Sequence, residues 1–356
     1  MPPRAVGILG VGVHLPPTRR PNGWWPAEVV AAWHRPPPPG PPPPAPTTAA
    51  GRAIAQAMAA DPDPFAGVRA RHVLAPEFDA IDMEELAARA ALDHAGCTPA
   101  QVDLVLAHSP VPAVLHGNPA CELHHRLGLR ATAPSLEVTA AGYAFLAQLA
   151  VAHAMITAGA ATTALLVQSA LGSRLNHPTD PLSGRFGDAA TAVVVGAVAD
   201  GFGLRSAAHR TDGATPHTLV ATTASGRWYD AGPVQMTVPD PMAMRRLLLD
   251  TVDRGCEVVA AALAQAALPA AAVDVFLAHQ GAAWLQALTR EHAGLVKAAT
   301  VDSYADTAHI GAASVPLDLR LAWDRGLLTS GAEVVLFAGG TGMTYGATVL
   351  RWGGQL

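Results

Sequence analysis

Charged side chains are scarce in this chain of 356 residues. Asp, Glu, Lys and Arg together make up 14% of it, and the formal net charge at pH 7 is -5. Proteins that bind nucleic acid or an anionic membrane surface usually carry a basic field, so this composition argues against both partners. A surface with so little charge also favours burial against a second subunit, and we expect a homodimer.

Cysteine is scarce as well, and its pattern excludes two kinds of site. Cys97, Cys121 and Cys256 are odd in number, widely spaced and without CxxC or Cys/His clustering. They predict neither a disulfide framework nor a zinc site, and they fit a reducing cytoplasm. We therefore expect no metal and no bound cofactor.

No apolar run has the pattern of a membrane span or a cleaved leader. Residues 5–15 are apolar but broken by glycines, and no small-residue cleavage site follows, which predicts a first strand. Residues 149–167 are apolar over a greater length, yet His153, Thr157 and Gly159 interrupt them. We expect a helix that ends near Gly159, followed by a buried strand.

Hydrophobic residues and proline are abundant by contrast. Half of the chain is hydrophobic, which is enough for a sizeable core. The segment 34–48, HRPPPPGPPPPAPTT, predicts an exposed insertion, because proline removes backbone donors and favours extended geometry. Residues 82–96 predict a helix with an acidic start and a closing glycine, and residues 251–268 predict another.

Three pairs of segments repeat at an offset of 171 positions. Strand-like residues 102–108 match 273–279, and residues 160–167 match 331–338. The turn AAGY, which begins at Ala140, lies opposite GAAS, which begins at Gly311. Three matches at one offset indicate a duplicated unit.

The duplication predicts an α/β protein with two pseudo-symmetric halves. We place them at 1–200, which contains the proline-rich insertion, and at 201–356. Alternating helices and apolar strands predict mainly parallel sheets covered by helices, in a five-layered α-β-α-β-α structure. Sites in such folds gather at the carboxyl ends of strands and at helix N-termini.

Six separated motifs carry a family resemblance. They are GVRARHVLAP at 67–76, the helix ending DHAGC at 93–97, FGDAATAVVVG at 186–196, HQGAAWL at 279–285, HIGAASVPL at 309–317 and GTGMTYGATVLRW at 340–352. Together they resemble the ketoacyl synthase III family of the thiolase superfamily, over residues 5–352 apart from the insertion. The resemblance implies a thiolase fold and chemistry on acyl thioesters.

The resemblance also implies a catalytic constellation, from which this chain departs. The family uses a cysteine at the N-terminus of a buried helix, a histidine and an asparagine. Laying its pattern on EVTAAGYAF puts Gly142 at the cysteine position, while the histidine maps on His279 and the asparagine on His309. We expect His279 and His309 to be catalytic, and the backbone N–H groups of Gly142 and Gly340 to form an oxyanion hole.

Other residues are candidates for substrate contacts. Arg69 and Arg71 are similar to the family's basic residues at the mouth of the coenzyme A or carrier-protein channel, although a solvated loop explains them equally well. Tyr143 and Gln280 flank the altered site, and we expect them to line it. Cys121 fits a structural role better than a catalytic one.

Without a thiol, an acyl-enzyme intermediate on the usual residue is excluded. The sequence therefore favours direct acyl transfer from a coenzyme A or acyl-carrier-protein thioester to a hydroxyl or amine of a small molecule in natural-product biosynthesis, with His279 as the base. Two alternatives stay open. One is decarboxylation of a malonyl thioester, and the other is a non-catalytic subunit that pairs with an active homologue.

Overall fold

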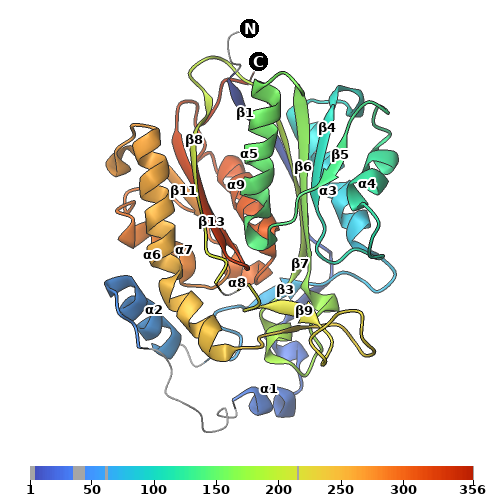
Figure 1. Cartoon of the computed structure of the whole chain (residues 1–356), viewed down its shortest axis with the longest axis vertical. Helices are drawn as coiled ribbons and strands as arrows, with labels where there is room; N and C mark the ends of the chain where they lie inside the picture. Colours follow the sequence, from blue (N-terminus) through green and yellow to red (C-terminus); the bar gives the residue numbers. More distant parts are fainter. Residues whose placement is uncertain (1–4, 35–44, 61–62, 215, 356) are drawn as a thin grey trace.

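Two β-sheets face each other across a pair of central helices, and further helices cover their outer faces (Figure 1). The computed structural model describes residues 5–34, 45–60, 63–214 and 216–355. The resulting order of layers is helix, sheet, helix, sheet, helix, which confirms the predicted five-layered α/β structure. Most of the proline-rich segment 34–48 lies outside the described residues.

The first sheet has the strand order β1-β7-β6-β4-β5. Its central strands are buried along almost their whole length because both faces are covered by helices. β4 runs parallel to β5 and β6, whereas β7 runs antiparallel to β6 and β1. The strands are β1 (Val6–His14), β4 (Leu104–His108), β5 (Ser135–Glu137), β6 (Thr163–Leu171) and β7 (Asp188–Ala197).

The second sheet, of order β11-β12-β13-β8, repeats this arrangement. β11 is parallel to β12, and β13 is antiparallel to both of its neighbours. Both sheets are thus mixed, so the expectation of mainly parallel sheets was wrong: β7 in the first half and β13 in the second run antiparallel to both of their neighbours. The strands are β8 (Gly203–Thr211), β11 (Val275–Ala278), β12 (Glu333–Gly340) and β13 (Thr344–Arg351).

The central layer consists of α5 (Ala144–Thr157) and α9 (Ser314–Asp324). Phe145, Leu149 and Leu319 belong to one core cluster that reaches both sheets. The predicted helix end near Gly159 and the buried strand after it are confirmed by α5 and β6. No helix in the described ranges is both long and apolar enough to cross a membrane.

Among the described residues, two helices cover the outer face of each sheet. On the first sheet lie α3 (Ala80–Ala95), which ends at the left-handed Gly96 as its sequence predicted, and α4 (Pro119–Leu127). On the second sheet lie α6 (Pro241–Gln265) and α7 (Leu285–His292). The helix expected at 251–268 therefore begins ten residues earlier, at Pro241, where Asp240 caps two backbone N–H groups.

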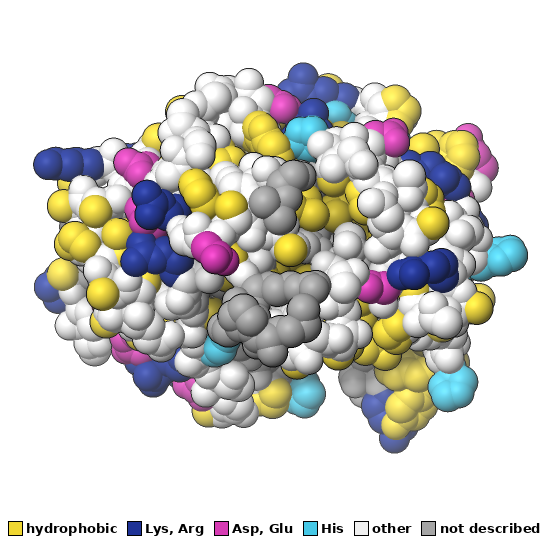
Figure 2. Space-filling view, turned by 90° about the horizontal axis from the view of Figure 1, so that it is seen from above, with side chains coloured by type: hydrophobic (Ala, Val, Ile, Leu, Met, Phe, Trp, Pro, Cys, Tyr) yellow, Lys and Arg dark blue, Asp and Glu magenta, His cyan; other side chains and the backbone are white. Residues whose placement is uncertain are grey.

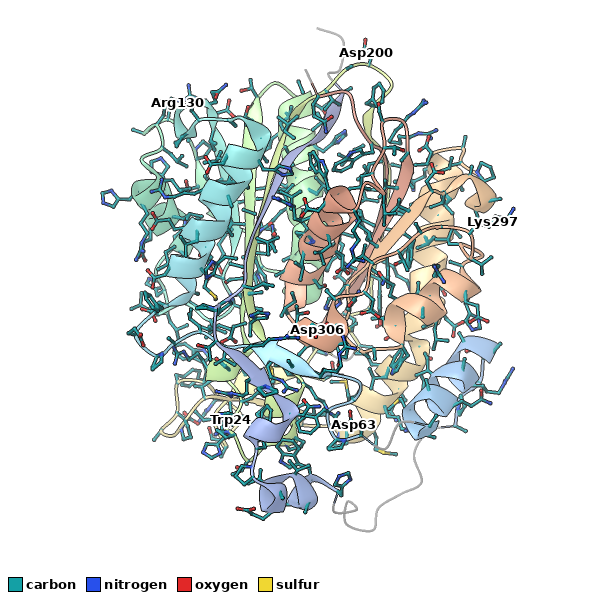
Figure 3. The ribbon with its side chains drawn as sticks, turned by 180° about the vertical axis from the view of Figure 1, so that it is seen from behind. Trp24, Asp63, Arg130, Asp200, Lys297 and Asp306 are labelled. Carbon is teal, nitrogen blue, oxygen red and sulfur yellow. The ribbon has the colours of Figure 1, made fainter. Side chains whose placement is uncertain are left out.

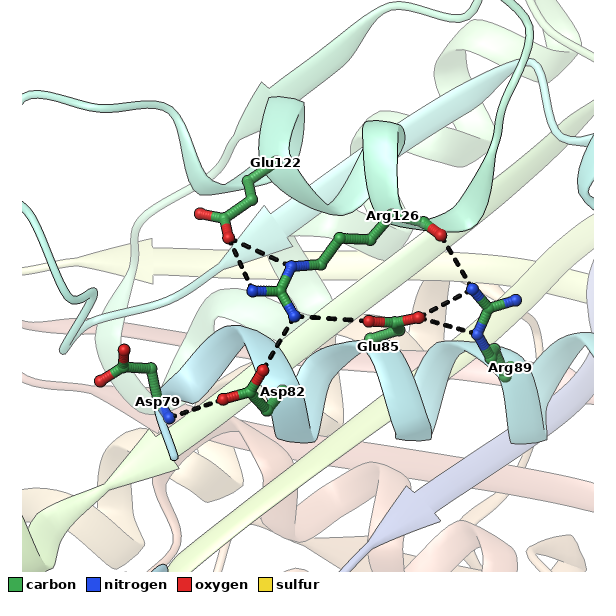
Figure 4. Close-up of polar contacts among 6 residues, drawn as sticks. All are labelled: Asp79, Asp82, Glu85, Arg89, Glu122 and Arg126. Atoms are coloured by element: carbon green, nitrogen blue, oxygen red, sulfur yellow. Dashed lines mark hydrogen bonds and ion pairs between the residues drawn. The ribbon is translucent and has the colours of Figure 1, made fainter. Parts of the chain in front are cut away.

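Ion pairs join the two helices on the first sheet (Figure 4). Arg126 of α4 contacts Asp82 and Glu85 of α3 at 2.8 and 3.4 Å, and Glu122 of its own helix at 2.9 Å. The bond to Asp82 raises the pKa of Arg126. Arg89 adds a bond to Glu85 and another to the carbonyl of Arg126.

The repeat offset changes by one residue within the fold. β4 and β11 begin at Leu104 and Val275, 171 positions apart. The short turns before α5 and α9 begin at Ala141 and Gly311, only 170 apart. The predicted duplication holds, but the alignment of AAGY with GAAS has to shift by one position.

Short elements cap the end of the molecule at which β4 and β11 finish (Figure 1). Trp24 and Asp63 lie at this end, and Asp306 lies between it and the sheets (Figure 3). On the opposite face, basic and acidic side chains are scattered without a field of one sign (Figure 2). The cap contains β2 (Arg19–Pro21), α1 (Ala27–Trp33), α2 (Ala49–Ala60), β3 (Ala70–His72), β9 (Val220–Thr222), β10 (Gln235–Thr237) and α8 (Tyr304–Thr307).

Candidate active site

The turn before α5 presents backbone N–H groups at a helix N-terminus between the two sheets. Val138 bonds back to the carbonyl of Ala107 at 2.8 Å, so the turn lies at the end of β4. Ala141 adopts φ 46°, a left-handed conformation that residues with a Cβ rarely occupy. This sharp turn points Gly142 toward the second half of the molecule.

His279 follows the last residue of β11 and is almost completely buried. Its backbone N–H donates to Phe337 at 2.8 Å, which continues the strand pairing with β12. Burial and the neighbouring His309 lower the pKa of its imidazole to about 3, against a hydrogen bond to the backbone of Gly339. Its Nε2 has no hydrogen-bond partner among the described residues, so an unprotonated nitrogen faces the turn.

His309 stands opposite His279, and the ring centroids are 5.1 Å apart at an interplanar angle of 82°. Its backbone pairs with the segment before β7, donating to Arg185 and accepting from Gly187. The N–H of Gly311 donates to its Nδ1 at 3.3 Å, so the neutral ring carries its proton on Nε2. Burial lowers its pKa to about 4, which favours this neutral form.

Gly142 packs against His279 too closely for any side chain. A Cβ at this position would lie 2.5 Å from the carbonyl oxygen of Gly339 and 2.6 Å from Cε1 of His279. Both distances are below any normal carbon contact. The imidazole of His279 and the carbonyl of Gly339 thus fill the volume that a Cβ at position 142 would need.

Gly340 and Tyr143 lie on the far side of the same turn. A Cβ at Gly340 would meet the carbonyl oxygen of Ala140 at 2.2 Å, so the glycine allows β12 to approach the turn. The hydroxyl of Tyr143 bonds to Nδ1 of His209, and burial raises its pKa to about 12. Tyr143 is therefore directed at β8 rather than at the histidine pair.

Two residues expected to contact substrate are engaged inside the protein. Arg71 is fully buried, and its guanidinium donates to the carbonyls of Arg20 and Gly184 and stacks on Trp25. Gln280 is also buried, and its amide bonds only to protein groups. Because neither faces solvent, we replace their expected contact with substrate by a structural role.

Arg69 fits its expectation better. Its side chain is 72% exposed at the capped end, where it pairs with Asp306 at 2.7 Å. His309 is partly exposed at the same end, as are Gly281 and Ala282. The capped end is therefore the side on which the histidine pair lies nearest to solvent.

The three cysteines lie outside this site. Burial raises the pKa of the thiols of Cys97 and Cys256, the latter to about 11, which disfavours a thiolate. Cys121 is exposed on α4, on the outer face of the first sheet. Within the described part of the chain, no three His, Cys, Asp or Glu side chains gather as metal ligands would.

Sequence reasoning missed Phe186 and Asp318. The ring of Phe186 packs on His309 with centroids 4.6 Å apart. Asp318 is fully buried on α9 and accepts a hydrogen bond from Gln280. A signal for Asp318 was present, because SVPLDLRLA places a lone acid within an apolar helix stripe.

Two family models match separate parts of the chain. Residues 136–213 match the family described as 3-oxoacyl-(acyl-carrier-protein, ACP) synthase III, and residues 263–352 match the C-terminal part of the same family. The two matched ranges contain all three positions of the Gly/His/His constellation.

Solved structures resemble the chain over nearly its whole length. The 3-oxoacyl-(ACP) synthase III of Pseudomonas aeruginosa PAO1 is 25% identical with a TM-score of 0.78, covering 98% of each chain. The priming β-ketosynthase of the R1128 polyketide pathway is 23% identical with a TM-score of 0.80, covering 100% of this chain and 99% of that one. A variant of Xanthomonas campestris OleA, solved with bound lauric acid and lauroyl-CoA, is 19% identical with a TM-score of 0.77, covering 98% of this chain and 100% of that one.

Proposed function

Because this chain is a ketoacyl synthase III-like protein of the thiolase superfamily, we propose that it transfers an acyl group directly from a thioester to an acceptor alcohol or amine. The observation that carries the proposal is the pair His279 and His309 beside a glycine that leaves no room for a nucleophile. Proton transfer and oxyanion stabilisation both remain available to such a pair.

The reaction needs one proton acceptor and one hydrogen-bond donor. Nε2 of His279 takes the proton of the acceptor as its oxygen or nitrogen attacks the thioester carbonyl carbon. The Nε2–H of His309 and the N–H of Gly142 stabilise the resulting oxyanion. As the C–S bond breaks, the proton returns from His279 to the sulfur, which leaves as a free thiol.

The low pKa of His279 has two consequences. The imidazole stays unprotonated, and therefore able to accept a proton, far below the pH at which an ordinary histidine becomes charged. A proton on it is costly in the empty site, but the oxyanion that forms beside it favours the charged ring. The base is thus strengthened at the moment when it is used.

The proposal also includes the chemical class of the acyl donor and the kind of pathway in which the protein acts. One relative was solved with lauroyl-CoA and another primes a polyketide pathway, which supports a coenzyme A or carrier-protein thioester and a role in natural-product biosynthesis. Arg69 at the capped end is the candidate for contact with the donor's phosphates. We further propose a homodimer in the cytoplasm that needs no resident cofactor.

The test combines intact-protein mass spectrometry with an assay of free thiol. Purified protein is mixed with acetyl, malonyl and longer acyl thioesters and with candidate alcohols and amines, alongside His279→Ala. We expect thiol release and acylated acceptor without a mass shift of the protein, and loss of both in the variant. A persistent acyl adduct on the protein would contradict direct transfer.

Two other outcomes would favour the alternatives. Release of carbon dioxide from malonyl thioester without an acceptor would indicate a decarboxylase, which needs the same two histidines to stabilise an enolate. Absence of turnover, relieved by adding an active homologue, would indicate a non-catalytic partner subunit.

A further inference from the structure

A buried polar cluster lies directly behind His279. The side-chain Nε2 of Gln280 donates to Oδ2 of Asp318 at 2.8 Å and to the carbonyl of Val301 at 3.1 Å. Its Oε1 accepts from the backbone N–H of Ser303 at 3.3 Å. Gln280 and Asp318 are 2% and 0% exposed.

The surroundings fix the orientation of the Gln280 amide. The Val301 carbonyl can only accept and the Ser303 N–H can only donate, so the NH₂ group must face Val301 and the oxygen must face Ser303. The second N–H of this group is then directed at Asp318, which has to accept it. Removing that acceptor would leave a buried donor unpaired, which destabilises this arrangement of the amide.

The same cluster holds the start of the segment that carries His309. Ser303 caps the one-turn helix α8, and the hydroxyl of Thr307 bonds back to the carbonyl of Ser303 at 2.9 Å. α8 ends at Ala308, which has φ 60° and ψ -162°, a conformation normally confined to glycine. A strained residue of this kind persists only when the structure fixes it from both sides.

His309 has such supports on both sides of Ala308. On its C-terminal side, the backbone of His309 pairs with Arg185 and Gly187. On its N-terminal side, Gln280, itself bonded to Asp318, accepts from the backbone N–H of Ser303 at the start of α8. Without the second support, Ala308 can relax and His309 can turn away from His279.

We propose that Gln280 and Asp318 form a buried clamp that positions His309 opposite His279, with Asp318 as a positioning residue that touches no reactant. This inference rests on the proposed function only for its kinetic consequence. The placement of His309 can be measured without any turnover.

The test uses two substitutions of the same carboxyl. Asp318→Leu keeps the approximate size and removes the acceptor, whereas Asp318→Asn keeps an acceptor for Gln280. Glu84→Gln is the matched control, because Glu84 is another fully buried carboxyl, bonded to Ser169 on the outer side of the first sheet. Gln280→Met provides a second way to open the clamp if Asp318→Leu does not fold.

The first readout is ¹⁵N NMR of histidine-labelled protein, with the His309 signals assigned from their absence in His309→Asn. We expect wild type, Asp318→Asn and Glu84→Gln to show one Nε2–H tautomer for His309. Asp318→Leu and Gln280→Met should show averaged signals. An unchanged His309 spectrum in a folded Asp318→Leu or Gln280→Met protein would overturn the clamp.

The second readout is kinetic. Opening the clamp should lower kcat about 10- to 100-fold with the KM of the thioester changed less than about twofold, because positioning and not binding is lost. Asp318→Asn should stay within about threefold of wild type. A wild-type protein without acyl transfer would contradict the proposed function, while the NMR result would still decide whether the clamp exists.

Discussion

β4 and β11 occupy equivalent places in the two halves, and a buried histidine stands at the end of each. His108 is 3% exposed and His279 is 7% exposed. Each has one ring nitrogen without a hydrogen-bond partner in the described structure, and burial is the main reason that their pKa values fall to about 4 and about 3. Judged alone, either ring could serve as a base.

Their neighbours differ. His279 faces a turn with glycine at position 142 and has His309 at 5.1 Å. In the other half, 170 positions away, the corresponding residues are Ala312, which carries a Cβ, and Thr139, which is exposed. His108 pairs in register with Gln168, within a polar row that continues to Thr191. A strand-end histidine thus becomes a catalytic candidate through its neighbours, not through its own burial.

Removing each histidine in turn should reveal the largest difference between the two halves. We expect His279→Ala to lower the rate of acyl transfer about 1,000-fold, because the proton acceptor is lost. His108→Ala should keep the rate within about threefold of wild type, although its stability falls. Thiol release under saturating thioester measures both, and an equal loss in the two variants would mean that the halves do not differ in function.

The donor role of His309 gives the next largest effect. His309→Ala removes the Nε2–H and should lower kcat about 100-fold. His309→Asn supplies an amide N–H in its place and should recover the rate to within about tenfold of wild type. If alanine and asparagine are equally damaging, His309 acts through proton transfer and not as a donor.

The third test exchanges the small residues of the two turns. Gly142→Ala places a methyl group within 2.6 Å of His279, so we expect about 2 kcal/mol lower stability and a displaced imidazole. Ala312→Gly should cost only about 1 kcal/mol, the usual penalty for a more flexible backbone. Urea unfolding measures the stability of both variants. A fully stable Gly142→Ala protein would show that His279 leaves room for a Cβ at position 142.

Stability at acid pH tests the lowered pKa that His108 and His279 share. Between the unfolded pKa near 6.5 and the folded value of about 4, the unfolded chain binds a proton that native His108 does not. The stability associated with neutral His108 is therefore lost as pH falls through this range, by about 1 kcal/mol per pH unit. His108→Gln should flatten the dependence by that amount in urea unfolding between about pH 7 and pH 5.

The pH dependence of His108→Gln must be compared with that of the wild-type protein, because buried acids change the stability with pH in the opposite direction. Burial raises the pKa of Glu84, Asp188 and Asp318, so these groups bind protons in the native state first and favour folding at low pH. A pH profile of His108→Gln that is identical to wild type would mean that His108 binds its proton equally well in the folded and the unfolded protein.

The smallest expected effect concerns the outer layer of the first half. Arg126→Gln removes the contacts with Asp82, Glu85 and Glu122 between and along α3 and α4 (Figure 4). We expect a loss of at most about 1 kcal/mol that shrinks in high salt, because these pairs are partly exposed. Arg227→Gln, in an exposed loop pair with Asp230, is the control and should change nothing measurable.

Local patterns predicted much of this molecule. Apolar strands, a helix closed by Gly96 and a repeat of segments predicted the two halves, and motif order predicted that Gly142, His279 and His309 come together. These features depend on periodicity and turn chemistry, which a sequence displays directly.

Other features depended on packing that no local pattern contains. The sequence aligned Gly142 with the family's cysteine, but it could not show that a Cβ there would collide with His279 and Gly339, since that requires the distance between β12 and the turn. Arg71 is a charged residue that the sequence placed at the mouth of the substrate channel. In the structure the cap folds over it and supplies carbonyl acceptors. Antiparallel pairing of β7 and β13 was hidden because buried strands of either direction are equally apolar.

The fit between Gly142 and His279 constrains the routes by which such a site can change. A side chain at position 142 meets an occupied volume, so a single substitution does not place a thiol beside a working base. His279 or the glycines of β12 would have to shift first, through an intermediate protein with neither arrangement intact. Introducing a thiol at position 142 therefore calls for a second substitution, in β12 or at His279, and not for a change at the turn alone.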